Sequence, residues 1–350
     1  MKSFKYFLVW TIPLSGYIAF TNEGLLAWFG VLYAFVILPI LDHFLPINST
    51  NHDAKTIKQF ENNSFYDIIL ISLIPVQLVF LIWFLFSIDA PDLSATTFYG
   101  RVFSMGILCT VLGINAGHEL GHRTQRSMQI GAKILLTTTL YNHFFIEHNF
   151  GHHRNVGTPD DAASANRGEW VYPFIVKSAF FGWVNSWQIE SKRLKRIGVS
   201  FFSIQNEVLV WQLFQWSTLA IVFLLFGSVV GFAWIGASIV GATFLECVNY
   251  IEHYGLVRAK VSGHRYENVE VYHSWNSDHL MGRSILLEVT RHSDHHHSPH
   301  KSYPTLNSPK GAPHLPTGYP GMIVLSLFCP LFIAIMDKKL ETLPHIVNKV

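Results

Sequence analysis

The sequence predicts an all-α integral membrane protein with six transmembrane helices in three hairpins and a histidine-rich cap on one side of the membrane. Half of the 350 residues are hydrophobic, only 14% are charged and the mean hydropathy is +0.28, which is typical of a membrane protein rather than a soluble globule. Long apolar runs occur in pairs, and histidine clusters follow where those pairs end. The net charge of +2 gives no indication of a nucleic-acid partner.

Six apolar runs are each long enough to cross the hydrocarbon core of a bilayer as a helix. They pair into hairpins because only short turns separate them, near residues 22–24, 89–96 and 227–229. Pro13 and Pro39 are acceptable in such spans when neighbouring helices bind the carbonyls that a proline leaves free. The expected spans are 4–21, 25–41, 66–88, 97–117, 207–226 and 230–251.

Two further apolar runs are too interrupted to count as spans. Residues 128–146 contain Lys133 and three consecutive threonines, so we expect a helix that packs at the membrane face or is partly re-entrant. Residues 322–336 are short and broken by a proline. The polar remainder, 118–206 and 252–350, is expected to form the cap of a single domain that comprises residues 1–350.

The distribution of basic residues predicts the orientation of these spans. The three short loops on the outer side contain no Lys or Arg, and every basic residue except Arg101, near the outer end of the fourth span, lies on the other side. Because cytoplasmic loops are enriched in Lys and Arg, the cap is expected to lie at the cytoplasmic face. No small-residue cleavage site follows the first run, so we expect that run to be retained as a span.

The same topology collects nine histidines at the cytoplasmic face. HELGH, EHNFGHH and RHSDHH each contain two or three of them, and NYIEHYGL adds one. Helical residues at i and i+4 project from one face, so His118 is expected to point with His122, and His148 with His152. A lone HExxH would indicate one zinc ion with about four ligands, whereas nine imidazoles suit two metal ions. The candidate ligands are His118, His122, His148, His152, His153, His253, His292, His295 and His296.

Four acidic residues, Glu119, Glu147, Glu252 and Asp294, lie within two positions of a candidate ligand. Each could accept a hydrogen bond from an imidazole and orient it. Each could equally be an ordinary solvated charge, and the sequence leaves both interpretations open.

The motifs HxxxH, HxxxHH and HxxHH resemble the histidine boxes of the membrane di-iron superfamily, which includes fatty-acid desaturases and membrane hydroxylases. Within it, HELGHR, NHFFIEHNFGHHRNVGTPDDAA, NYIEHYGL, YHSWNS and LLEVTRHSDHHHSP are similar to segments of the integral-membrane alkane 1-monooxygenases. The likeness runs from about residue 100 to 320. Two departures are Arg123, where lysine is common in that family, and the third consecutive histidine, His297, to which we assign no ligand role.

The resemblance implies a multi-pass enzyme of the inner (cytoplasmic) membrane with a cytoplasmic histidine-rich di-iron cap. Two non-haem Fe ions would use O2 to convert a medium- or long-chain n-alkane into a 1-alkanol, and the second oxygen atom would leave as water. This stoichiometry requires two electrons. The chain has no dinucleotide-binding or P-loop motif and only three cysteines, so the electrons must come from another protein. The resemblance points to rubredoxin, reduced by a NAD(P)H-dependent rubredoxin reductase.

We expect the acidic rubredoxin to dock near Arg154, Arg291 and the basic cluster at 192–196. Contact of residues 192–196 with lipid headgroups is an equal alternative. Other functions also remain open: a membrane fatty-acid desaturase or hydroxylase, a xylene-type methyl monooxygenase, a membrane zinc protease, or a purely structural membrane protein. In the second span, Ala27, Gly30 and Ala34 form a small-residue stripe that is either a substrate groove or a site of close helix packing.

Overall fold

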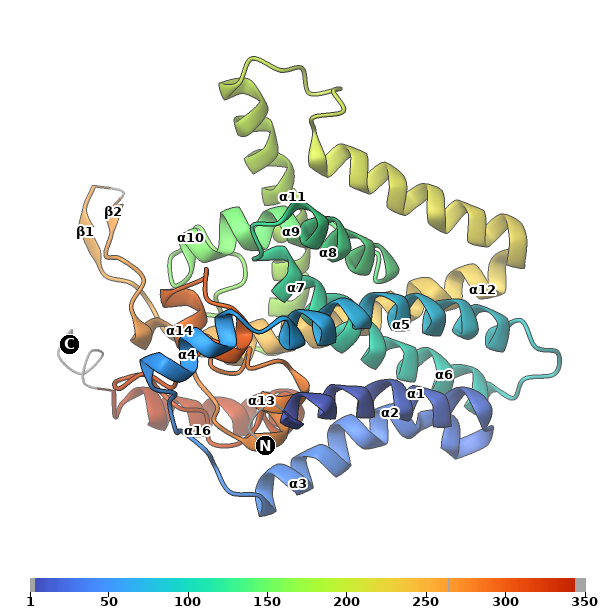
Figure 1. Cartoon of the computed structure of the whole chain (residues 1–350), viewed down its shortest axis with the longest axis horizontal. Helices are drawn as coiled ribbons and strands as arrows, with labels where there is room; N and C mark the ends of the chain where they lie inside the picture. The colour runs from blue at the N-terminus through green and yellow to red at the C-terminus, as the bar shows by residue number, and fades with distance from the viewer. Residues whose placement is uncertain (1–3, 264, 344–350) are drawn as a thin grey trace.

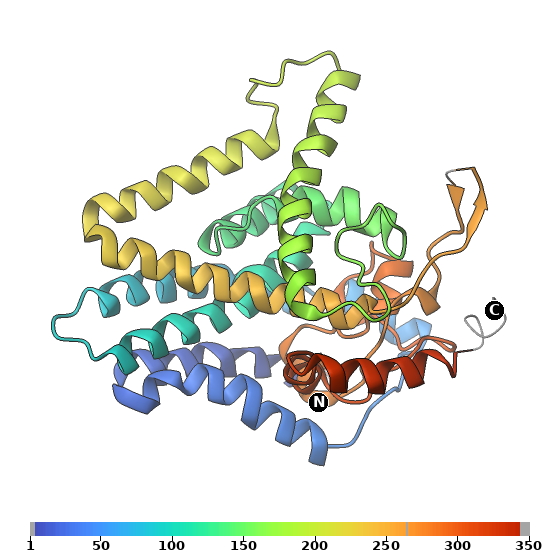
Figure 2. The same ribbon diagram turned by 180° about the vertical axis from the view of Figure 1, so that it is seen from behind.

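The computed structural model describes residues 4–263 and 265–343, and this part of the chain is mostly helical (Figure 1). Long helices run side by side in a bundle, and shorter elements gather at one end of it (Figure 1, Figure 2). Among the described residues, the strands are limited to an antiparallel pair, β1 (Lys260–Ser262) and β2 (Arg265–Tyr266), which projects from that end.

The first hairpin is helical along both arms, with local changes of helix type. One arm consists of η1 (Phe4–Trp10, 3-10) and α1 (Thr11–Thr21). The other consists of η2 (Gly24–Trp28, 3-10), α2 (Phe29–Leu32), η3 (Tyr33–Ile37, π) and α3 (Leu38–Phe44). The turn between them is held by the second hairpin, because the Gly24 amide donates to Thr97 Oγ1 at 2.9 Å.

The second hairpin begins each arm at a capping side chain. The Asn63 side chain accepts from the Phe65 amide before α5 (Ser64–Ile88), and Ser94 accepts from the Thr97 amide before α6 (Ala95–Leu108). The second arm continues without interruption through the π-helix η4 (Cys109–Asn115) into α7 (Ala116–Gly121). The short helix α4 (Ala54–Glu61) lies in the preceding connection.

The small-residue stripe of the second span packs against α6. A Cβ placed on Gly30 would lie 2.9 Å from Ser104 Cβ, and one placed on Gly100 would lie 2.8 Å from Ala27 Cβ. Ser104 Oγ also donates to the Ala27 carbonyl at 2.8 Å. Of the two interpretations of the stripe, close helix packing therefore accounts for Ala27 and Gly30.

The third hairpin appears as one 47-residue helix, α12 (Glu207–His253), that is broken at Gly227. Gly227 has φ 80° and ψ −177°, a conformation that is essentially restricted to glycine. The two halves fold back on one another at this point (Figure 1, Figure 2). The turn predicted near 227–229 is thus present.

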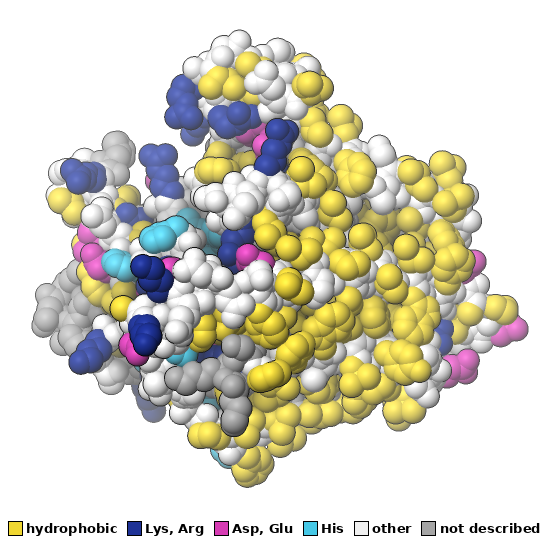
Figure 3. Space-filling model, in the orientation of Figure 1, with side chains coloured by type: hydrophobic (Ala, Val, Ile, Leu, Met, Phe, Trp, Pro, Cys, Tyr) yellow, Lys and Arg dark blue, Asp and Glu magenta, His cyan; other side chains and the backbone are white. Residues whose placement is uncertain are grey.

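Four described helical segments are long and apolar enough to cross a membrane: Gly24–Phe44, Ser64–Ile88, Ala95–Gly121 and Glu207–His253. They coincide with five of the six expected spans, since the last segment contains both arms of the third hairpin. The remaining expected span, 4–21, is helical but is not one of these four. Hydrophobic side chains cover the surface of the bundle. Lys, Arg and His gather at the end of the molecule where the short elements lie (Figure 3).

The segment 128–146 enters the bundle. Helix α8 (Arg126–Thr138) of this segment ends in the interior of the bundle, where the Thr138 carbonyl accepts a hydrogen bond from Trp234 Nε1 at 2.9 Å. Thr138 Oγ1 accepts from Gln77 Nε2 at 3.1 Å, and Gln77 lies halfway along α5. Non-helical backbone is tolerated at such a depth only when protein surrounds it, and this arrangement fits the partly re-entrant alternative.

The other elements of the cap are short, apart from α11 (Val171–Arg196), which crosses the bundle at one end (Figure 1). They are α9 (Phe144–Glu147), η5 (His148–His152, π), α10 (His153–Asn155), η6 (Val271–His273, 3-10), α13 (Leu280–Ile285), α14 (His292–His297), η7 (Tyr303–Thr305, 3-10), α15 (Tyr319–Ser326) and α16 (Cys329–Leu340). Residue 264 and residues 344–350 of the expected cap lie outside the described residues.

Candidate metal centre

Nine histidines from four separate parts of the chain meet where the bundle joins the cap. The end of α7 supplies His118 and His122, and the end of α12 supplies His253. The segment formed by η5 and α10 supplies three more, and α14 supplies the last three. The nine divide into two groups, one of five and one of four, and within each group the candidate ligand atoms lie within 4.8 Å of one another.

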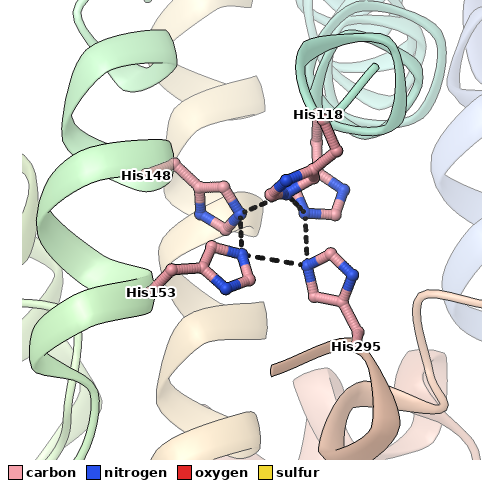
Figure 4. Close-up of side chains that lie close together, drawn as sticks. His118, His148, His153 and His295 are labelled. Carbon is pink, nitrogen blue, oxygen red and sulfur yellow. Dashed lines mark hydrogen bonds between the residues drawn. The ribbon is translucent and has the colours of Figure 1, made fainter. Parts of the chain in front are cut away.

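The five-histidine group is a closed ring of Nε2 atoms, and Figure 4 labels four of its members, His118, His148, His153 and His295. Starting from His118, the Nε2–Nε2 distances are 3.1 Å to His122, 3.2 Å on to His148, 3.0 Å to His153, 3.1 Å to His295 and 3.0 Å back to His118. In Figure 4 the rings converge on one point from three directions, namely α7, the η5–α10 segment and α14.

The four-histidine group lies beside the first and consists of His152, His253, His292 and His296. The Nε2 atoms of His152 and His296 are 3.1 Å apart, as are those of His253 and His292. All four side chains are buried. The rings of His153 and His296, one from each group, stack at 4.4 Å, so the two groups share a wall.

The π-helix η5 corrects one expectation from the sequence. The i, i+4 spacing predicted that His148 and His152 would point the same way, but His148 belongs to the five-histidine group and His152 to the four-histidine group. His148 instead joins His153, five residues later, because a π-helical turn is wider than an α-helical one. The three histidines of this six-residue stretch are therefore divided between the two groups.

The donor set fits two cations. Two nitrogens that each bind an ion at about 2.1 Å, at right angles to one another, are about 3 Å apart, which matches the Nε2–Nε2 distances of 3.0–3.2 Å. Burial lowers the pKa of His148, His153, His292, His295 and His296, which favours the neutral imidazole that a metal requires.

Asp161 orients one of these imidazoles. Its carboxylate lies 3.0 and 3.1 Å from His152 Nδ1, and it also accepts from Ser164 Oγ at 2.6 Å. Burial alone would lower the pKa of His152, but the nearby carboxylates, Asp161 above all and then Glu147 and Glu252, raise that pKa to about 9, so a metal ion at Nε2 would have to displace a proton. The contact favours a proton on Nδ1 and leaves Nε2 directed at the four-histidine group.

Of the four acids that lie next to candidate ligands in sequence, only Glu252 has a carboxylate oxygen within 4.0 Å of a ligand nitrogen. Its Oε2 lies 3.2 Å from His292 Nε2, so a carboxylate oxygen faces the four-histidine group. Glu119 instead pairs with Arg123 at 3.1 Å, and Asp294 with Lys301 at 2.8 Å. Glu147 is buried, and its Cγ lies 3.7 Å from the position a Cβ on Gly182 of α11 would take.

The turn that precedes α14 is fixed by buried Glu288. Its carboxylate accepts from Arg283 Nε at 2.7 Å and from Tyr6 Oη at 2.9 Å, and it forms an ion pair with Lys5. Burial would raise the pKa of Glu288, but the three cations around it lower that pKa to about 2. The N-terminal arm of the bundle is thereby attached to the segment that carries three candidate ligands.

Arg291, directly before His292, extends this buried network. Its guanidinium donates to the carbonyls of Leu306 at 2.7 Å and Thr50 at 3.1 Å, and lies 3.3 Å from Asp278. The side chain is 0% exposed. The expectation that Arg291 helps to dock an electron donor is therefore wrong, because its charge does not reach the surface; it positions α14 instead.

Four further histidines of the cap, His143, His273, His279 and His297, are among those that belong to neither group. His297 is directed away from them and is near the Val269 carbonyl at 3.3 Å. His273 contacts Glu267 at 3.2 Å, and His279 contacts Ser277 at 3.0 Å. His143 is buried with its ring against Tyr141.

Asp161, Glu288 and Arg291 are the functional residues that the sequence reasoning missed or misassigned. Asp161 lies nine residues after His152 in TPDDAA, and no regular spacing connects an acid in a loop to a particular imidazole. Glu288 and Arg291 lie close to the third cluster, but one partner of each, Tyr6 and Thr50 respectively, is more than 200 residues away in the chain.

Comparison with known proteins provides evidence on the family of this chain that is independent of the geometry of the histidines. The model of the family described as fatty acid desaturase matches residues 94–322. An alkane 1-monooxygenase from Alcanivorax borkumensis is 34% identical over 341 residues, covering 97% of this chain and 84% of the relative. An alkane 1-monooxygenase from Ectopseudomonas oleovorans is 35% identical over 95% of this chain and 81% of the relative, and one from Pseudomonas aeruginosa is 35% identical over 90% and 84%.

Proposed function

This chain belongs to the fatty acid desaturase family and, within it, to the alkane 1-monooxygenases, and on that premise we propose that it hydroxylates the terminal carbon of n-alkanes. The reaction consumes the alkane, O2, two electrons and two protons, and it yields a 1-alkanol and water. The observation that carries the proposal is the convergence of nine imidazoles into two adjacent groups, one of five histidines and one of four.

The nine histidines would hold two Fe ions, one in each group. When bound, the iron pair supplies the redox chemistry that activates O2. The chain's own residues aim the ligand nitrogens inward: Asp161 binds the Nδ1 proton of His152, and Glu252 adds a carboxylate next to His292. The surrounding burial excludes water, which limits side reactions of activated oxygen.

The proposed topology has six spans in three hairpins. Four long apolar helices support it, and the glycine-only conformation of Gly227 divides one of them into two arms of membrane-spanning length. The helical run Phe4–Thr21, beside them in the bundle, would be the remaining span. An alkane has no polar group and partitions into the bilayer, so a centre at the end of this bundle is within its reach.

The proposed location is the inner (cytoplasmic) membrane, with the metal centre on the cytoplasmic side. The loops at the far end of the bundle contain Glu23, Asp89 and Asp92 and no Lys or Arg, whereas Lys and Arg gather around the histidines (Figure 3). This asymmetry is the one that the positive-inside rule describes.

Rubredoxin, reduced by a NAD(P)H-dependent rubredoxin reductase, is the proposed electron donor. The three cysteines, Cys109, Cys247 and Cys329, are all buried and too few for an iron–sulfur cluster of four cysteines. The exposed side chain of Arg154 follows His153 directly, so an acidic carrier bound there would be close to the five-histidine group.

The test is turnover by purified, iron-loaded protein in lipid with rubredoxin, its reductase and NAD(P)H. We expect octane to yield 1-octanol. Toluene as the preferred substrate would instead indicate a xylene-type enzyme, and activity restricted to acyl lipids or acyl-CoA would indicate a desaturase or fatty-acid hydroxylase. A protein that binds zinc and consumes no O2 would contradict the proposal.

A further inference from the structure

The outer end of α11 is a projecting corner of the molecule that the metal centre does not use. α11 lies crosswise to α5 and α6, and its C-terminal end extends beyond the bundle before residues 197–206 lead into α12 (Figure 1, Figure 2). Because α12 is one of the membrane-spanning candidates, this corner lies where such a helix begins.

Three cations at this corner have no counter-ion. Lys192, Lys195 and Arg196, here called the α11 patch, are exposed and form no ion pair with any described residue. Arg193, between them, is by contrast bound to Glu190 at 2.7 Å and to the Gln205 carbonyl. Lys and Arg side chains lie on the side of the corner that faces the cap (Figure 3).

Large apolar side chains surround the same corner. Ile204 is 92% exposed and Phe202 85% exposed, and both lie in the segment just before α12. Phe201 stacks on Trp187 of α11 with ring centroids 5.7 Å apart. Along α11, Phe180 and Phe181 are also exposed. Apolar groups at this level of exposure are unfavourable in water and favourable in a bilayer.

We propose that the α11 patch binds the phosphate groups of anionic phospholipids, while residues 197–206 insert their apolar side chains into the membrane interface. A helix that lies across the end of a bundle, with aromatic groups toward the acyl chains and Lys and Arg at headgroup level, has the layout of an interfacial anchor. The inference rests on the proposed membrane orientation and requires nothing of the chemistry at the histidines.

The apolar surroundings of the patch argue for lipid rather than for the electron donor. Distance from the metal centre does not separate the two, because Ile189 of α11 lies against Gly151 of η5, where an added Cβ would be 3.0 Å from Ile189 Cδ1. Residues 192–196 are three to seven positions further along the helix, which corresponds to about 5 to 11 Å at 1.5 Å per residue. The exposed side chains of Phe202 and Ile204 beside the patch, however, favour an acyl-chain environment over contact with a soluble carrier.

The experiment measures how tightly detergent-solubilised full-length protein retains dioleoylphosphatidylglycerol relative to dioleoylphosphatidylcholine, by native mass spectrometry. The variant carries Lys192→Gln, Lys195→Gln and Arg196→Gln together. Each basic residue near an anionic surface strengthens binding about fivefold, so the triple variant should bind phosphatidylglycerol at least tenfold more weakly. The wild-type preference should also decline as salt is raised.

A charge-matched control carries Lys260→Gln, Arg265→Gln and Lys310→Gln, which remove three exposed cap cations and should leave the lipid preference unchanged. Iron content of each variant, measured in parallel, shows that the protein is folded and separates this test from that of the alkane chemistry. A triple variant with wild-type phosphatidylglycerol binding would overturn the proposal. So would an unchanged lipid preference combined with a raised KM for rubredoxin, because the patch would then be a protein-binding surface.

Discussion

At the scale of single residues, the centre depends on which nitrogen each imidazole presents. In both groups the short contacts are between Nε2 atoms, so each Nδ1 is left for the surrounding protein. His152 shows what that arrangement requires, because its Nδ1 is held by Asp161 at 3.0 Å. A neutral ring with its proton on the outer nitrogen is a ready ligand for iron.

Replacing individual histidines tests the two groups separately. His122→Ala and His295→Ala each remove one nitrogen from the five-histidine group, and His152→Ala removes one from the four-histidine group. Each should lower bound iron below two ions per chain and abolish hydroxylation. His43→Ala is the control, because His43 is exposed and belongs to neither group. Metal analysis and octane turnover are the measurements, and full activity in any of the first three variants would contradict the assignment.

Asp161→Asn removes the charge beside His152 while keeping the shape of the side chain. Removing the hydrogen-bond partner of a ligating histidine typically lowers metal affinity 10- to 100-fold, so we expect the four-histidine group to bind iron 10- to 100-fold more weakly. Competition with a chelator measures the loss. Asp160→Asn changes an exposed neighbour and should leave affinity unchanged. Equal affinity in the two variants would mean that Asp161 does not support the metal site.

Glu288→Gln tests the buried ionic cluster through pH. The folded-state pKa of about 2 is below the value of 4.5 expected for an unfolded glutamate, so the carboxylate stabilises the fold above pH 4.5. This contribution, about 3 kcal/mol by linkage, disappears as pH falls from 4.5 toward 2. Wild type should therefore exceed Glu288→Gln in thermal stability at pH 7, and the difference should narrow in acid. A constant difference from pH 7 to pH 3 would exclude this role.

The sequence identified the candidate ligands better than the residues that support them. Imidazoles cluster in motifs with recognisable spacing, and all nine came together. Asp161, Glu288 and Arg291 act through contacts whose partners are set by the tertiary fold, and the fully buried Arg291 was misassigned to the surface. A charged side chain in a polar segment gives no local indication that it is buried.

At the scale of elements, the type of helix decides where each ligand points. η5 is π-helical, and it separates His148 from His152 while pairing His148 with His153. In α14, by contrast, His292 and His296 keep the i, i+4 relation of an α-helix and fall in the same group. Periodicity in the sequence could not reveal the wider turn, because HxxxHH is compatible with either geometry.

Gly227 gives a prediction for α12. Its backbone conformation is one that residues with a Cβ adopt only at a cost of about 1–3 kcal/mol, so Gly227→Ala should lower the thermal midpoint by several degrees. Gly236→Ala is the matched control, because Gly236 is helical and a Cβ there would be 3.4 Å from Val102 Cγ1. Thermal unfolding in detergent compares them. If both variants melt like wild type, the break at Gly227 does not depend on glycine.

At the scale of the whole molecule, the division between bundle and cap follows from hydropathy and charge. The long apolar runs and the absence of Lys and Arg from the outer loops predicted where the histidines would gather. The connections within the cap were not predictable in the same way. Arg291 binds Thr50 and Glu288 binds Tyr6 across most of the chain, and such contacts leave no periodic signal.

The central claim is that two histidine-held iron ions transfer one atom of O2 to an alkane. The most direct measurement is the oxygen isotope content of 1-octanol formed by iron-loaded protein under ¹⁸O₂ in ordinary water, with iron counted in the same sample. The account predicts two iron ions per chain and one ¹⁸O atom in each alcohol. Alcohol that carries oxygen from water, or turnover by protein that lacks iron, would contradict it.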